Sequence, residues 1–128
     1  MARYEVLTET HAGQTIVVAR LIGQADTGTV SELGAALAAR AAQGVPLRIL
    51  LDEGELRAGL VLPQDIRGIV EKWRSTIARP NVRLAAYAPN PIIFGLNRLG
   101  LSIAARDTGD RVAVFSRREE ALDWLVRG

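Results

Sequence analysis

Three carboxylates lie close together near the middle of the chain, at Asp52, Glu53 and Glu55. They follow the apolar run Leu47–Leu51, which predicts a buried strand, and open α/β sheets bind ligands beyond the carboxyl ends of their strands. Clustered oxygens at such a place could hold a divalent cation or act as a general acid and base. No histidine and no separate third carboxylate lies near them in sequence. We therefore expect an acidic loop with solvated charges, in which one carboxylate caps backbone amides.

Other residue types that carry chemistry are scarce. The chain has no cysteine, which excludes disulfides, thiolate metal sites and a cysteine nucleophile. Its one histidine, His11, falls in a predicted hairpin turn, where we expect a surface residue and neither a catalytic triad nor a histidine metal cluster. Gly95 and Gly100 are not followed by the Lys-Ser/Thr pair of a phosphate-binding loop, and the dinucleotide-binding fingerprint is absent. We predict no catalytic residue, no metal and no cofactor.

The segment Tyr87–Ile103 is the strongest candidate for binding. Asn90 is a good N-cap and Pro91 suits a first helical position, so a helix is predicted from Asn90 to Ala105. A helix that packs on a sheet needs one apolar stripe about 100° wide, yet this one has apolar residues on more than one side. The first predicted stripe is Ile92, Leu96, Leu99 and Ile103, and the second is Phe94, Leu101 and Ala105.

Two explanations of the second stripe stay open. Either it lines an apolar pocket or docking face, or the helix is simply buried more fully than usual. In the first case a few polar groups would fix the ligand, and Arg98 or Arg106 would meet an anionic head group. The expected ligand-binding residues are Tyr87, Asn90, Ile93, Phe94, Asn97, Arg98 and Leu101.

The surrounding pattern predicts the elements that would position these residues. Strands are expected at 4–8, 15–22, 47–51, 82–87 and 111–115. The other helices are expected from a capping box at Thr29–Glu32 to Gln43, between Pro63 and Pro80, and after a second capping box at Ser116–Glu119. The order β-β-α-β-α-β-α-β-α indicates an α/β fold with one mostly parallel five-stranded sheet and four main helices.

Length and composition are consistent with this fold. At 128 residues, 48% of them hydrophobic and 23% charged, residues 1–128 are expected to form a single globular domain. Neither a signal peptide nor a membrane span of about 20 apolar residues is visible, so we expect a cytoplasmic protein.

The net charge of +2 is unevenly distributed. Up to Leu56 there are 4 basic and 7 acidic side chains, and from Arg57 onward there are 12 basic and 7 acidic. The excess of basic side chains from Arg57 onward could favour an anionic ligand, or these arginines could simply solvate helix faces. No nucleic-acid-binding signature appears, so nucleic acid is not an expected partner.

Four stretches carry a resemblance to a known family. They are the strand Ile16–Gly23, the run Ile49–Asp52 with the acidic residues after it, Ala86–Pro91 leading into an apolar helix, and the closing Val114–Leu125. From Thr15 to Val126 the chain resembles the SpoIIAA-like proteins, a branch of the STAS fold named after the sporulation anti-anti-sigma factor and related in architecture to CRAL-TRIO lipid-binding domains. The resemblance implies that fold and a binding role.

One departure from the family pattern matters. Anti-anti-sigma factors carry a phosphorylatable serine after the third strand, whereas the matching residues 52–63 include no serine or threonine. The kinase-operated switch is therefore not expected. We expect a non-catalytic binding or regulatory domain that takes an apolar or amphiphilic, lipid-like ligand at the 90–105 helix. The alternative is a protein-interaction or homodimerisation module that uses the same apolar face.

Overall fold

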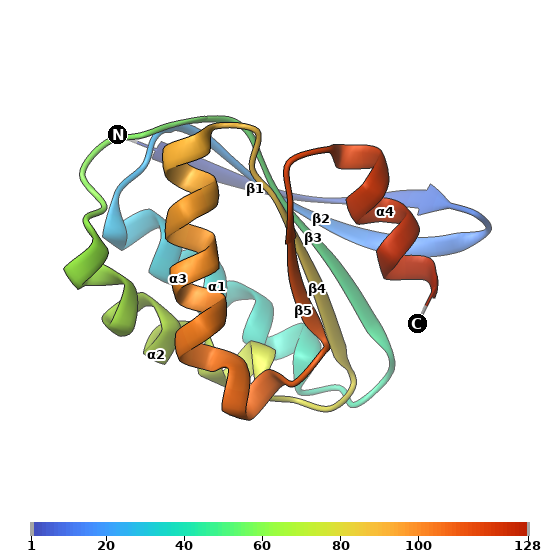
Figure 1. Cartoon of the computed structure of the whole chain (residues 1–128). Helices are drawn as coiled ribbons and strands as arrows, with labels where there is room; N and C mark the ends of the chain where they lie inside the picture. Colours follow the sequence, from blue (N-terminus) through green and yellow to red (C-terminus); the bar gives the residue numbers. More distant parts are fainter. Residues whose placement is uncertain (1, 128) are drawn as a thin grey trace.

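A computed structural model describes residues 2–127, and their elements alternate in the predicted order (Figure 1). The strands are β1 (Ala2–His11), β2 (Gln14–Gln24), β3 (Leu47–Arg57), β4 (Val82–Tyr87) and β5 (Val112–Phe115). The helices are α1 (Thr27–Ala41), α2 (Ile66–Ile77), which follows the short 3₁₀ turn η1 (Pro63–Asp65), α3 (Pro91–Thr108) and α4 (Arg118–Arg127). No helix within these residues is long and apolar enough to cross a membrane.

The strands form one five-stranded sheet in the order β1-β2-β3-β4-β5. β1 and β2 are an antiparallel hairpin, and the other neighbours are parallel, each joined through a helix. The predicted mostly parallel sheet is confirmed. Because β2 to β5 run in the same direction, their carboxyl ends meet at one edge of the sheet.

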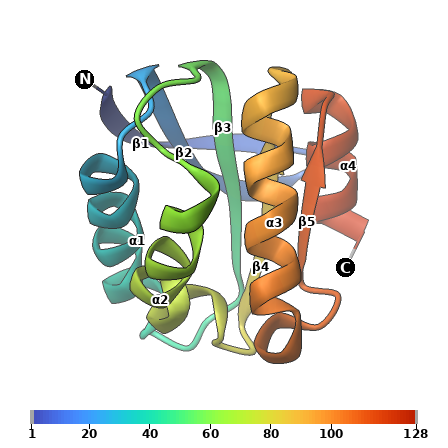
Figure 2. The same cartoon turned by 60° about the vertical axis from the view of Figure 1, so that its left-hand side comes forward.

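Helices cover the two faces unequally. α1, α2 and α3 lie side by side on one face, and α4 packs on the other (Figures 1 and 2). Alternate residues of the central strands therefore enter two separate cores. The larger core lies under α1–α3 and includes Leu21, Leu33, Leu51, Trp73 and Leu84. The smaller core lies under α4 and consists of Ile16, Val18, Leu50, Ala85, Ala121, Leu122 and Leu125.

α1 begins earlier than the sequence pattern predicted. Its N-cap is Asp26, whose Oδ1 accepts a hydrogen bond of 2.7 Å from the backbone amide of Thr29. The capping box expected at Thr29–Glu32 is therefore wrong. Asp26 also accepts a bond from the amide of Ala2, so the carboxylate caps the helix and fixes the start of β1. These bonds hold the pKa of Asp26 below its ordinary value.

The prediction for the start of α3 is confirmed. The side chain of Asn90 accepts bonds from the amides of Ile92 and Ile93 at 2.9 and 3.3 Å. The first predicted stripe is only partly buried: Leu96 and Ile103 pack against the larger core, whereas Ile92 is 64% exposed and Leu99 is 37% exposed. The face toward the sheet instead includes Ile93, Ala104 and Thr108, with the partly buried Leu96, Asn97, Gly100 and Leu101.

Candidate functional site

The carboxyl-terminal half of β3 differs most from the sequence prediction. The strand does not end at Leu51 but continues to Arg57, because residues 55–57 pair with residues 22–24 of β2. Asp52 and Glu53 are therefore buried, at 6% and 5% exposure, and the solvated acidic loop is a wrong prediction for both. Glu55 is exposed as expected. The predicted amide cap is confirmed, since Asp52 Oδ1 accepts a hydrogen bond from the amide of Gly54.

Strand alternation directs these two carboxylates to opposite faces of the sheet. Glu53 lies under α3, where its Oε1 accepts a 2.6 Å hydrogen bond from Nδ2 of Asn97. The same amide group donates to the carbonyl of Ile93 at 2.9 Å. Burial raises the pKa of Glu53 to about 8, with a smaller raising effect from the charge of Asp52 and an opposing effect from the Asn97 bond. Its carboxyl group is therefore mostly protonated and neutral at pH 7.

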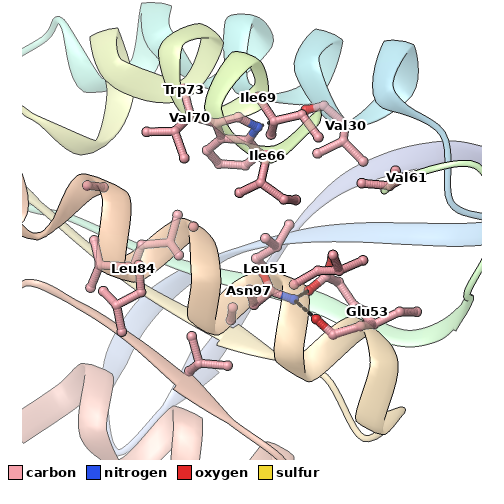
Figure 3. A pocket seen from close by; sticks show the side chains of 18 of the residues that line it. Val30, Leu51, Glu53, Val61, Ile66, Ile69, Val70, Trp73, Leu84 and Asn97 are labelled. Carbon is pink, nitrogen blue, oxygen red and sulfur yellow. Dashed lines mark hydrogen bonds between the residues drawn. The ribbon is translucent and has the colours of Figure 1, made fainter. Parts of the chain in front are cut away.

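Glu53 and Asn97 are the polar groups in the wall of an apolar cavity of about 130 Å³ between the sheet and the helices (Figure 3). β3, β4 and β5 form its floor, and α2 and α3 form most of the opposite wall. The apolar lining includes Leu51, Leu56, Val61, Ile66, Val70, Trp73, Leu84, Ile93, Leu96, Leu101 and Val112. Glu53 is the one ionisable side chain among the lining residues that the structure describes.

A surface groove adjoins this cavity. Val61 and Leu96 belong to both, so the two spaces share a wall. The groove runs between the segment after β3 and the first turns of α3. Its exposed apolar side chains are Leu62, Ile92 and Leu99.

The cavity brings together three of the seven predicted ligand-binding residues: Ile93, Asn97 and Leu101. The other four, Tyr87, Asn90, Phe94 and Arg98, do not line it. Tyr87 packs against the smaller core, Asn90 caps α3, and Phe94 packs against the larger core with Arg98 over its ring at 6.0 Å. Arg98 and Arg106 are exposed.

Asp52, on the opposite face, belongs to a charged network. Nε of Arg118 donates to its Oδ2 at 3.2 Å, and Nε of Arg20 lies 3.8 Å away. Arg118 also makes two hydrogen bonds to Glu9, at 2.9 and 3.1 Å. These contacts lower the pKa of Glu9 and raise that of Arg118. The network joins β1, β3 and the first turn of α4, which accounts for the buried charge of Asp52 without a ligand.

His11 is the last residue of β1, not a residue of the turn. Its Nε2 lies 2.8 Å from Asp123 and 3.9 Å from Glu119, both on α4. Within residues 2–127 this is the one group of three side chains that could share a metal ion. Asp123 and Glu119 are mostly exposed, and the hydrogen bond between His11 and Asp123 accounts for the contact by itself.

Neither a protein-family model nor a curated protein matches the sequence. Solved structures do match the fold. The crystal structure of an uncharacterised protein of the DUF3478 family with a SpoIIAA-like fold, from Shewanella loihica PV-4, aligns with a TM-score of 0.64 at 18% identity, over 98% of this chain and 95% of that one. An anti-sigma factor antagonist from Mycobacterium paratuberculosis aligns with a TM-score of 0.47 at 21% identity, over 96% and 94%. The fold is SpoIIAA-like, as the sequence resemblance predicted.

Proposed function

We propose that this SpoIIAA-like domain is a non-catalytic binding protein that holds a small apolar or amphiphilic molecule in the cavity under α3. The observation that carries the proposal is the cavity itself, which is almost wholly apolar and has one polar pair, Glu53 and Asn97. Ligand sites commonly combine an apolar wall with a few polar groups that orient the ligand.

The size of the cavity sets the size of the ligand. An engineered apolar cavity of roughly 150 Å³ in another protein binds benzene. A space of about 130 Å³ therefore suits one ring or a short alkyl segment. A longer amphiphile would have to extend past Val61 and Leu96 into the groove.

The proposal that the domain is non-catalytic rests on the lining residues. Acid–base enzymes generally need groups that differ in protonation and both reach the substrate. Glu53 is the one ionisable group in the described lining, and the lining includes no serine or threonine that could serve as a nucleophile.

The test is a titration of the protein with ethylbenzene, followed by NMR of methyl groups that line the cavity, such as those of Leu84 and Leu101. We expect saturable shifts at these methyls and a higher melting temperature. Ala104→Leu places a larger side chain at the cavity wall and should weaken binding, whereas Ala105→Leu, on the exposed side of the same helix, should not. The proposal fails if the cavity methyls do not respond, or if a folded Ala104→Leu protein binds as well as the wild type.

A second candidate function is a protein contact, and the exposed apolar residues beside the groove favour it. Leu62, Ile92 and Leu99, which line the groove, are 49%, 64% and 37% exposed, and such a group of exposed large apolar side chains is unusual on a monomer. A second copy of the chain could cover them. Sedimentation velocity tests this: the wild type should self-associate, and Ile92→Glu should shift it toward monomer. A monomer at all concentrations would refute this candidate.

A further inference from the structure

None of the described residues that line the cavity carries a positive charge that would keep the carboxylate of Glu53 ionised. Several elements contribute residues to the cavity wall: α1, α2, α3, β4, β5 and the segment after β3. Every described lining residue from these elements is uncharged. The charge that acts on Glu53 is that of Asp52, which faces the other side of the sheet and disfavours a second negative charge. A carboxylic acid in such a place keeps its proton at neutral pH, because an apolar site disfavours its charged form.

The two oxygens of Glu53 differ in their surroundings. Oε1 accepts the hydrogen bond from Asn97, so the proton of the neutral acid resides on Oε2. No hydrogen bond to Oε2 occurs among the described residues, and no enclosed side-chain oxygen there lacks a partner. Oε2 is therefore not fully enclosed by protein atoms, and since Glu53 lines the cavity, we take Oε2 as the oxygen available to a ligand there.

We propose that Glu53 binds the ligand as a neutral hydrogen-bond donor, and that the ligand carries an uncharged acceptor oxygen, such as a carbonyl, at its polar end. Asn97 is the positioning residue: its Nδ2 is held by the carbonyl of Ile93 and fixes the carboxyl group from the Oε1 side. This inference rests on the proposed function and narrows it to a ligand class. An anionic ligand would meet no cation among the described residues of the cavity, so a neutral contact replaces the head-group role first expected for Arg98 and Arg106.

The test compares two probes of nearly the same shape, acetophenone and ethylbenzene, which differ in a carbonyl oxygen. At pH 6 we expect acetophenone to bind roughly three- to tenfold more tightly, the range of one net hydrogen bond. At pH 9.5 Glu53 is ionised and can no longer donate, so the preference should disappear or reverse. Ethylbenzene binding should change little between these pH values.

Glu53→Gln is the decisive variant, because its amide group can accept from Asn97 and still donate to the ligand at every pH. It should keep the preference for acetophenone at both pH 6 and pH 9.5. Glu53→Leu, if folded by circular dichroism, should bind both probes equally at both pH values.

The outcomes separate the two proposals. Equal binding of the two probes to the wild type at pH 6 overturns the donor role of Glu53 and leaves the binding cavity intact. A preference that persists in the wild type at pH 9.5 also overturns it. If neither probe binds, the proposed function fails, and this inference fails with it.

Discussion

Asn97 and Glu53, 44 residues apart in the chain, are joined by a hydrogen bond of 2.6 Å between Nδ2 and Oε1. The bond links the second turn of α3 to the buried part of β3. It supplies one partner for a carboxyl group that burial would otherwise leave unsatisfied, and an unpartnered buried polar group is costly. The polar centre of the cavity is thus part of the connection between helix and sheet.

The first prediction concerns stability and pH. The pKa of Glu53 rises from about 4.5 in the unfolded chain to about 8 in the folded protein, so the neutral acid favours folding. Its contribution is complete below pH 4.5 and is lost as the pH rises through 8. One pKa unit corresponds to about 1.4 kcal/mol, so the expected loss is on the order of 3 to 5 kcal/mol.

Urea unfolding of the wild type and of Glu53→Gln at pH 5, 7 and 9 measures this effect. The free energy of unfolding of the wild type should fall across this range relative to that of Glu53→Gln, because every other titrating group is common to both. Glu55→Gln changes an exposed carboxylate on the same strand and should keep the wild-type profile. Parallel profiles for the wild type and Glu53→Gln would contradict the buried neutral acid.

Much of the fold could be predicted from local patterns. The nearly continuous apolar run at Leu47–Leu51 indicated a strand covered on both faces, and its residues do divide between the two cores, with Leu50 under α4 and Leu51 under the other helices. Asn90 followed by Pro91 correctly indicated the start of α3, because helix capping depends on residues that are adjacent in the sequence.

Asn97 was among the expected ligand-binding residues, but the burial of its partner Glu53 could not be predicted in this way. Asp52-Glu53-Gly54-Glu55 has the composition of a loop, and its burial depends on β2 and α3, which lie far away in sequence. Two signals were available: Leu56 resumes the apolar pattern after the carboxylates, and Asn97 is an amide on an otherwise apolar helix face. The first stripe of α3 was assigned from the spacing of apolar residues alone, and it therefore included Ile92 and Leu99, which are exposed.

The second prediction concerns the network on the other face. Arg118→Met should destabilise the protein by about 2 kcal/mol, because it removes a partner of the buried Asp52 together with the paired bonds to Glu9. Arg117→Met is the matched control: its side chain is 78% exposed and lies 3.8 Å from Glu120, so the cost should stay below about 0.5 kcal/mol. Chemical denaturation of both variants at pH 7 measures the difference in their free energies of unfolding. Equal losses in the two variants would show that the contacts of Arg118 with Asp52 and Glu9 do not stabilise the fold.

The third prediction compares two glycines inside helices. A β-carbon at Gly95 of α3 would meet no atom within 4 Å, so Gly95→Ala should stabilise the protein by about 0.5 to 1 kcal/mol through helix propensity. A β-carbon at Gly34 of α1 would lie 2.8 Å from the ring of Trp73. That ring is held in place, because its Nε1 donates to the carbonyl of Val30 at 2.9 Å.

Gly34→Ala should therefore destabilise the protein by roughly 1 to 2 kcal/mol, since overpacking outweighs the gain in helix propensity. Thermal and urea unfolding of both variants would measure the contrast. Trp73 also lines the cavity, so a displaced ring in Gly34→Ala should reduce ethylbenzene binding as well, whereas Gly95→Ala should leave binding unchanged. If Gly34→Ala were as stabilising as Gly95→Ala, α1 could not pack as closely on Trp73 of α2 as described. The shape of the cavity beside Trp73 would then also differ from the one described.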